Sequence, residues 1–200
     1  MHIAILTFQG FNELDSFIAL GVLNRIKKPN WRVTICCPEA EVTSMNGVTI
    51  KAQSTLEEAA TAEAVIVGSG IKTREVVESP ELMSRIRLNP DKQLIAAQCS
   101  GTLILARLGL VAGVPACTDL TTKPWVQEAG VEVLNQPFFA KGNVATAGGC
   151  FASPYLAAWI IARTEGLEAA TSALHYVAPV GEKDAYVSNA LRRITAYIAQ

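Results

Sequence analysis

Cys99 is the residue of this chain whose type and position best suit nucleophilic chemistry. It stands between the apolar run 94–97 and the apolar segment 101–110, an order that predicts a strand, a sharp turn and a helix. The helix N-terminus behind such a turn offers free N–H groups and partial positive charge, which lower the pKa of a thiol. The backbone N–H of Ser100 would supply one half of an oxyanion hole. The alternative is that Cys99 fills the core, because cysteine is among the most often buried residue types.

The other half of the oxyanion hole is expected from the loop Gly68-Ser69-Gly70, which follows a second apolar run at 64–67. This loop is not a dinucleotide-binding fingerprint, because Thr73 stands where that pattern needs its third glycine. The loop therefore gives no indication of a dinucleotide cofactor.

Two carboxylates, Glu13 and Asp15, come just after the first apolar run, residues 2–8. A carboxyl group there would face Cys99 if the two strands are neighbours, and it would hydrogen-bond the thiolate and donate or accept a proton. The alternative is that Asp15 is an ordinary residue in the first turn of a helix, where the helix dipole favours a negative charge.

The other thiols and the two histidines give weaker signals. The cysteine count is odd and no Cys-x-x-Cys pair occurs, the five positions being 36, 37, 99, 117 and 150. We expect neither a disulfide framework nor a metal site, because His2 and His175 do not stand at ligand spacing from any cysteine. Cys150 follows Gly148-Gly149 and is expected in the core or in the pocket wall.

Short apolar runs without alternation predict strands that are buried on both faces. We expect such strands at 2–8, 31–37, 64–67, 94–97, 131–134 and 144–147, and a hairpin over 42–50 around Asn46-Gly47. Helical spacing and capping residues predict helices at 14–26, from 54 onward, and at 73–88, 101–110, 153–165, 167–176 and 184–198. This alternation predicts one α/β domain over residues 1–200, with a mostly parallel sheet between two layers of helices. The working site of such a sheet lies at the carboxyl ends of its strands.

Composition excludes several classes of protein. Lys and Arg total 17 against 18 Asp and Glu, and the net charge of −1 gives no electrostatic reason to expect a nucleic-acid partner. Apolar residues make up 50% of the chain, which excludes intrinsic disorder. Charged residues make up 18%, below the usual value of about 25%. A surface this poor in charge favours self-association, and we expect a homodimer. The longest uncharged run, 142–162, contains glycines and a proline, so we expect no membrane span. No charged leader precedes the first apolar run, and we expect a cytoplasmic protein.

In their order along the chain, these motifs resemble the ThiJ/PfpI superfamily of class I glutamine amidotransferase-like proteins, and within it the isonitrile hydratases. The matching segments are 3–8, Glu13-Leu14-Asp15, 44–50, 65–70, Gln98-Cys99-Ser100-Gly101, 116–120 and 141–149. The C-terminal segment matches less clearly. The resemblance implies a flavodoxin-like three-layer sandwich, usually dimeric, with a nucleophile-elbow cysteine.

The resemblance also implies roles for single residues. Cys99 corresponds to the elbow cysteine of the family. Asp15 stands where isonitrile hydratases carry an aspartate, and Glu13 is the reserve candidate because other branches carry a glutamate in this region. Ser100 stands where the hydratases usually have threonine, and it keeps the hydroxyl group.

Two positions depart from the family pattern. Gly68-Ser69-Gly70 replaces the usual Pro-Gly-Gly, so the oxyanion loop is expected to have a different shape. Asp119 stands where many members carry a histidine, which excludes a Cys-His pair but agrees with a Cys-plus-Asp design. Whether Asp119 assists Cys99 or raises its pKa by repulsion stays open.

Several functions follow from the resemblance. A hydratase-like enzyme would attack an isonitrile with Cys99 and release an N-substituted formamide, without a metal or organic cofactor. A redox or stress sensor would oxidise Cys99, with Cys117 or Cys150 as the resolving thiol. Glyoxalase- or deglycase-like activity is a further alternative. Related domains of transcriptional regulators carry a helix-turn-helix module, which we do not expect in this nearly neutral chain.

Overall fold

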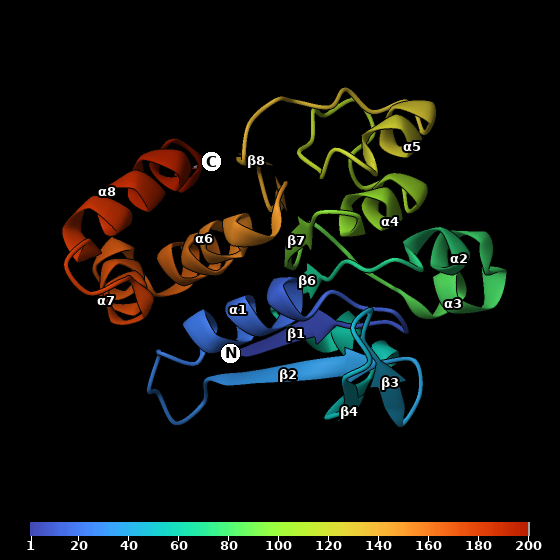
Figure 1. The fold of residues 1–200 in the computed structure, drawn as a ribbon, viewed down its shortest axis with the longest axis horizontal. Helices are drawn as coiled ribbons and strands as arrows, with labels where there is room; N and C mark the ends of the chain where they lie inside the picture. The colour runs from blue at the N-terminus through green and yellow to red at the C-terminus, as the bar shows by residue number, and fades with distance from the viewer. Residues whose placement is uncertain (200) are drawn as a thin grey trace.

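A seven-stranded sheet forms the centre of the computed structural model, which describes residues 1–199 (Figure 1). The strands follow the order β5-β2-β1-β6-β7-β9-β8. Their bounds are β1 His2–Leu6, β2 Arg32–Cys37, β5 Ser54–Thr55, β6 Ala64–Val67, β7 Leu94–Gln98, β8 Phe138–Lys141 and β9 Val144–Ala147. Neighbouring strands are parallel except for β8 and β9, which are antiparallel. The expected mostly parallel sheet is confirmed.

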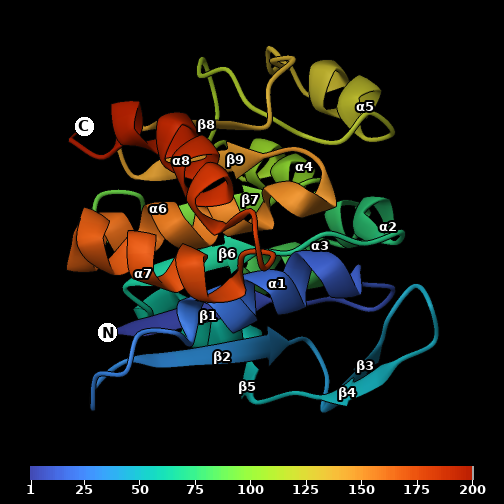
Figure 2. The same ribbon diagram turned by 60° about the vertical axis from the view of Figure 1, so that its left-hand side comes forward.

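Helices cover both faces of this sheet, as the two views in Figure 1 and Figure 2 show. One face carries α1 Glu13–Leu23, α6 Ser153–Glu165, α7 Leu167–Val177 and α8 Lys183–Ile194, and the other carries α2 Thr73–Glu78, α3 Pro80–Arg85, α4 Gly101–Arg107 and α5 Lys123–Glu128. Side chains alternate along a strand, so the two faces of β1 pack against different helices. Ile3 and Ile5 belong to the apolar cluster with α1, α6, α7 and α8, while Ala4 and Leu6 belong to the cluster on the other face. The expected three-layer α/β fold is therefore confirmed.

The expected hairpin is also present, as a separate antiparallel pair of β3 (Glu41–Thr43) and β4 (Thr49–Lys51). Gly47 has a φ of +89° in its turn, a value that glycine adopts without strain. The Met45 N–H donates to the Phe11 carbonyl at 2.9 Å. This bond ties the hairpin to the loop that precedes α1, beside the carboxyl end of β1.

The expected continuous helix over 73–88 is wrong, because the chain forms α2 and then α3. Pro80 has no N–H to continue a helix, and it disfavours helical geometry at the preceding residue. Ser79 accordingly has φ −91° and ψ 105°, and its Oγ accepts a hydrogen bond from the Leu82 N–H at 3.3 Å. The same residue thus ends one helix and caps the next.

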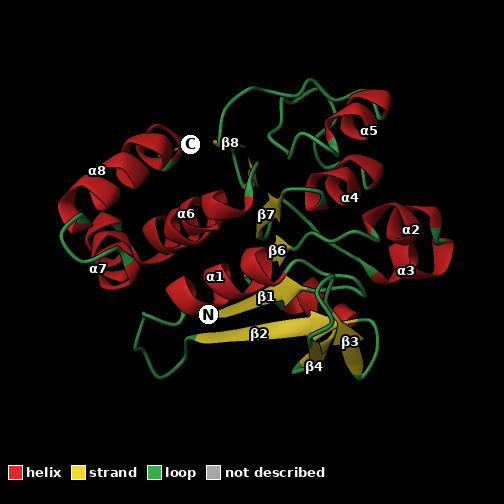
Figure 3. Ribbon diagram, viewed as in Figure 1, coloured by secondary structure: helices red, strands yellow, loops and turns green. Residues whose placement is uncertain are grey.

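Two further segments differ from expectation (Figure 3). Residues 131–134 form no strand in the described chain, and their only sheet-like pairing is the bridge of Val133 with Ala116. The strand that closes this edge is β8, which joins β9 through a tight turn at Gly142, with φ +58°. The segment from residue 54 forms β5 and a 3₁₀ helix, η1 (Leu56–Thr61), without a side-chain cap at its start.

The uncharged run 142–162 is divided among β9, a 3₁₀ turn, η2 (Cys150–Ala152), and α6, as expected. Its apolar side chains are buried inside the protein, with Trp159 and Leu156 fully enclosed. Within residues 1–199, no helix combines the length and the apolar character needed to cross a membrane.

The carboxyl ends of β1, β6, β7 and β9 lie side by side in the sheet. The register pairs Leu6 with Val67 and Val67 with Ala97, so these strands end at the same level. The loops that follow them therefore meet at one edge of the sheet, which is where parallel α/β folds place their sites.

Candidate active site

Cys99 occupies a sharp turn between β7 and α4. Its φ of +47° is the only positive value among the non-glycine residues that the structure describes. Two hydrogen bonds hold this backbone, since the Cys99 N–H donates to the Ala147 carbonyl and Thr118 Oγ1 donates to the Cys99 carbonyl, both at 2.8 Å. Such a conformation costs about 1–3 kcal/mol and persists only where the surroundings enforce it. The strained turn presents Cys99 at the end of the sheet, 4% exposed.

Gly101 explains how the elbow packs so tightly. A Cβ at this position would lie 2.4 Å from the Val67 carbonyl oxygen and 2.7 Å from that of Gly68. Only glycine allows the first turn of α4 to approach the end of β6 this closely. Gly148 has a similar role, because its Cβ would lie 2.2 Å from the Thr118 carbonyl oxygen.

Asp15 comes from the first turn of α1 and points inward rather than to solvent. Asn12 caps this helix by accepting the Leu14 N–H through its side chain. Asp15 is fully buried, and its Oδ2 accepts a hydrogen bond from the Ser69 hydroxyl. Its other oxygen, Oδ1, has no hydrogen-bond partner in the described chain. The helix dipole alone therefore does not explain Asp15, because an ordinary first-turn carboxylate would be exposed to solvent.

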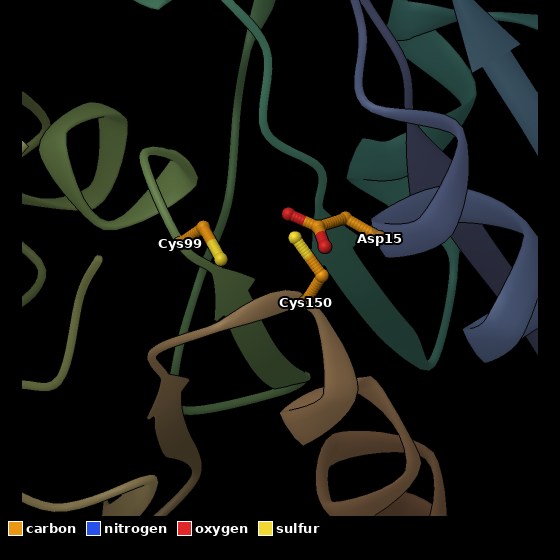
Figure 4. Close-up of side chains that lie close together, drawn as sticks. All are labelled: Asp15, Cys99 and Cys150. Atoms are coloured by element: carbon orange, nitrogen blue, oxygen red, sulfur yellow. The ribbon is translucent and has the colours of Figure 1, made fainter. Parts of the chain in front are cut away.

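Three side chains converge at this edge of the sheet, as Figure 4 shows. A carboxylate oxygen of Asp15 and the sulfurs of Cys99 and Cys150 all lie within 4.8 Å of one another. They come from α1, from the elbow and from the start of η2. Cys150 is partly exposed, which makes it the most accessible of the five thiols.

Each of the two sulfurs accepts a hydrogen bond from an amide side chain. Gln98 Nε2 lies 3.4 Å from Cys99 Sγ and donates also to the Gly149 carbonyl at 2.8 Å. Asn12 Nδ2 donates to Cys150 Sγ at 3.2 Å. These two amides hold the thiols facing Asp15.

Burial favours the protonated form of each group in the cluster. It raises the pKa of the Asp15 carboxyl, against the Ser69 hydrogen bond and the two facing thiols, which lower it. Burial and then the Asp15 carboxylate raise the pKa of the Cys99 thiol, and the same two causes raise that of Cys150. The sequence predicted a thiol pKa lowered by the helix N-terminus, whereas burial and the neighbouring Asp15 carboxylate act in the opposite direction on Cys99.

Two of the N–H groups in the expected oxyanion loop already donate hydrogen bonds within the protein. The Gly68 N–H donates to the Leu6 carbonyl at 2.9 Å, and the Gly70 N–H donates to Ser100 Oγ at 3.1 Å. Ser100 Oγ also pairs with Thr73 Oγ1 at 2.7 Å, so this hydroxyl fastens the elbow to the loop. Within residues 1–199, the N–H groups of Ser69 and Ser100 make no hydrogen bond and remain available as donors.

The structure does not bring Glu13 to Cys99. The Glu13 carboxylate accepts hydrogen bonds from the Ser44 hydroxyl and, at 2.9 Å, from Asn46 Nδ2, and the Ser44 bond lowers its pKa. It fastens α1 to the hairpin. Asp119 reaches the pocket wall, where its Oδ1 accepts the N–H groups of Thr121 and Thr122, each at 2.9 Å. Asp119 adds slightly to the raised Asp15 pKa by repulsion.

A pocket of about 360 Å³ opens onto Cys99. It is lined by Asn12, Met45, Ser69, Gly70, Ile71, Cys99, Ser100, Asp119, Thr121, Thr122, Trp125 and Cys150. No lysine, arginine or histidine is among these described residues. Four lining residues were not predicted from the sequence: Asn12, Met45, Ile71 and Trp125. They lie on separate loops and on α5, and no local motif marks them.

A family model describing the DJ-1/PfpI family matches residues 1–163. The chain belongs to the DJ-1/PfpI family. This confirms the superfamily expected from the sequence, while the finer likeness to isonitrile hydratases is not shown. No curated protein matches the chain.

Solved structures share the fold at low sequence identity. VC2308 protein is 19% identical, with a TM-score of 0.77 over 94% of this chain and 97% of its own. Drosophila melanogaster DJ-1beta is 21% identical, with a TM-score of 0.76 over 88% and 96%. Toxoplasma gondii DJ-1, solved as an oxidized protein, is 16% identical, with a TM-score of 0.75 over 88% and 97%.

Proposed function

We propose that the protein is a cysteine-dependent enzyme that adds the Cys99 thiol to a small electrophilic carbon, with isonitrile hydration as the reaction to test first. The observation that carries this proposal is the buried Asp15 carboxyl group in contact with the Cys99 thiol at the foot of a pocket. A nucleophile and a proton-transfer group are thereby held together away from bulk water.

The protonation of the pair favours a particular kind of reaction. Burial raises the pKa of both groups, so the site favours addition of a thiol together with its proton over attack by a free thiolate. An isonitrile R–N≡C suits such a site, since its terminal carbon takes up both the sulfur and a proton. Asp15 passes its proton to the carbon as the sulfur attacks, and the carboxylate takes up the proton of the Cys99 thiol, giving a thioimidate R–N=CH–S–Cys99. Water then adds, the C–S bond breaks, R–NH–CHO leaves, and the thiol regains its proton.

The pocket lining favours neutral substrates with an apolar substituent. Met45, Ile71 and Trp125 supply apolar surface, and the described lining has no cationic side chain to pair with a carboxylate. Asp15 and Asp119 both disfavour an anion. The free N–H groups of Ser69 and Ser100 would polarise the nitrogen or oxygen that develops charge during the reaction.

The test is formamide production from a panel of neutral isonitriles by the wild type and by Cys99→Ala. We expect turnover by the wild type and none above background by the variant. Absence of turnover on every isonitrile would exclude this substrate class, and undiminished turnover by Cys99→Ala would exclude Cys99 as the nucleophile.

A second candidate function is redox sensing, favoured by the position of Cys150 beside Cys99. Hydrogen peroxide would oxidise the Cys99 thiol to a sulfenic acid with release of one water, and the Cys150 thiol would then displace a second water to form a disulfide. Cys117 is fully buried and is not part of this cluster, so Cys150 is the better resolving thiol. Intact-mass and peptide analysis under graded peroxide tests this function, which requires Cys99 to oxidise faster than Cys36 or Cys37.

A further inference from the structure

We propose that Asp15, Cys99 and Cys150 form a binding site for a thiophilic divalent cation of the Zn²⁺ type. Two sulfurs and one carboxylate oxygen lie within 4.8 Å of one another. Zinc binds sulfur at about 2.3 Å and carboxylate oxygen at about 2.0–2.2 Å, so donors around one ion stand roughly 4 Å apart. Small side-chain adjustments therefore suffice to bring all three donors onto one ion.

The unpartnered oxygen of Asp15 is an independent sign of a missing ligand. Asp15 is fully buried, its Oδ2 is bonded to Ser69, and its Oδ1 has no hydrogen-bond partner in the described chain. Buried carboxylate oxygens are normally satisfied, and each exception in a native fold needs an explanation. A cation held between this carboxylate and the two sulfurs of the cluster supplies one.

Neighbouring side chains already hold each of the three donors in place. Gln98 Nε2 donates to Cys99 Sγ, Asn12 Nδ2 donates to Cys150 Sγ, and the Ser69 hydroxyl donates to Asp15 Oδ2. Hydrogen bonds of this kind orient metal ligands and stabilise thiolates at metal centres. The arrangement thus has the outer shell of a metal site as well as its ligands.

The fourth coordination position would face the pocket. Cys99 and Cys150 both line the pocket, and Cys150 is partly exposed, so an ion has a path from solvent. Three protein ligands with one open position is a common zinc arrangement. Each thiol that binds must release its proton to water, because the thiolate is the ligand form.

The expectation of no metal site rested on the spacing of cysteines and histidines along the chain. The three donors here are at positions 15, 99 and 150, and they meet only through the fold. The two histidines remain elsewhere, with His2 bonded to Thr34 at 2.7 Å and His175 exposed on α7. Local spacing identifies zinc fingers but not a site assembled from three separate segments of the chain.

Occupation of this site would block the proposed hydratase reaction, because the ion takes the sulfur that attacks the substrate. The binding proposal itself does not rest on that reaction. It requires only the three donors, and it can be tested with no substrate present. Loss of the proposed activity and loss of metal binding are therefore separate results.

The experiment titrates reduced, chelator-treated protein with Cd²⁺ and follows the ultraviolet charge-transfer absorption of thiolate-bound cadmium. We expect one ion per chain in the wild type, competed by Zn²⁺. Cys150→Ser should weaken binding at least about tenfold, and Asn12→Ala, which removes the donor to Cys150 Sγ together with the cap of α1, about 10–100-fold. Cys117→Ser, a buried thiol outside the cluster, is the matched control and should bind as the wild type does.

Two results would overturn the proposal: no saturable binding of one ion per chain, or equal binding by the wild type and Cys150→Ser. Thermal melting without metal verifies that each variant is folded. If Cys150→Ser fails to fold, Cys150→Ala replaces it, since this partly exposed position tolerates a smaller side chain. Formamide assays on metal-free protein then report separately on the proposed activity.

Discussion

At the scale of single residues, Asp15 opposes the ionisation of Cys99. Burial raises the pKa of both groups, and the carboxylate raises the thiol pKa further. Asp15 therefore has two effects with opposite consequences. It suppresses the free thiolate, and in the proposed reaction it moves the proton that addition of the thiol requires.

Asp15→Asn should separate these two effects. Loss of the negative charge lowers the Cys99 pKa, so alkylation of Cys99 by iodoacetamide at mildly alkaline pH should become faster. Formamide production should fall by about 10²–10⁴-fold, the usual contribution of a general acid or base. A variant whose alkylation and turnover both match those of the wild type would contradict the account.

The same substitution should change stability with a defined dependence on pH. A carboxyl group whose pKa is raised in the folded state contributes stability at acid pH and loses it as pH rises through that folded pKa. Asp15→Asn removes this loss, so its Tm at neutral pH should exceed that of the wild type. The difference should shrink as pH falls toward 4. Calorimetry across pH measures it, and a lower Tm for the variant at neutral pH would contradict the prediction.

Single-residue predictions from sequence succeeded where position along a strand determines position in space. Cys99 and Asp15 each follow a buried parallel strand, and such strands end at the same edge. Cys150 was expected in the core or the pocket wall and as one of two possible resolving thiols, but the amide donors Asn12 and Gln98 were not predicted. These residues meet through packing of loops, which no spacing in the chain records.

At the scale of elements, the elbow depends on close contact between α4 and β6. The elbow keeps Cys99 at a φ of +47°, and Gly101 lets the helix start against the carbonyl groups that end β6. The geometry of the nucleophile is therefore determined by a packing contact two residues away.

Gly101→Ala should destabilise the fold and reduce turnover. Its Cβ would meet two backbone carbonyl oxygens, which cannot move as a side chain can, and overpacking of this kind typically costs about 1–3 kcal/mol. Gly21→Ala in α1 is the control, because no heavy atom would lie within 4 Å of its Cβ, and alanine favours the helix by roughly 0.5–1 kcal/mol. Urea denaturation compares the two. Equal stability of both variants would mean that the contact at Gly101 is not limiting.

Elements were predicted well where burial dictates the pattern and less well elsewhere. The neighbouring strands β2, β1, β6 and β7 are largely buried on both faces, and all four were expected. Pro80 stood inside the predicted helix 73–88, and its effect on Ser79 outweighed the apolar spacing. β8 was missed because it is a four-residue edge strand whose pairing with β9 comes from the turn at Gly142.

At the scale of the whole molecule, an apolar patch adjoins the pocket. Leu14 and Phe17 on α1 and Met45 and Val48 on the hairpin are 36–47% exposed. Hydrogen bonds from Met45 to Phe11 and from Asn46 to Glu13 hold the hairpin against the start of α1. We propose that this patch is buried in a homodimer, since a chain poor in charge has few polar groups to cover it.

Light scattering at micromolar concentration should give the mass of a dimer, and Leu14→Glu should shift it toward the monomer. A glutamate in the first turn suits the dipole of α1, so the fold should tolerate this change. Val180→Glu is the control, because Val180 is 93% exposed outside the patch. A monomer mass for the wild type would refute the dimer, and equal dissociation by both variants would exclude this patch as its interface.

The most direct test of the central claim, that Cys99 attacks the substrate carbon, is the intact mass of the protein quenched in acid during turnover of an isonitrile. We predict a species heavier than the enzyme by the mass of one isonitrile, located on Cys99 by peptide mapping. It should be absent from Cys99→Ala. Formamide formation with no adduct on Cys99, at an undiminished rate in Cys99→Ala, would contradict the account.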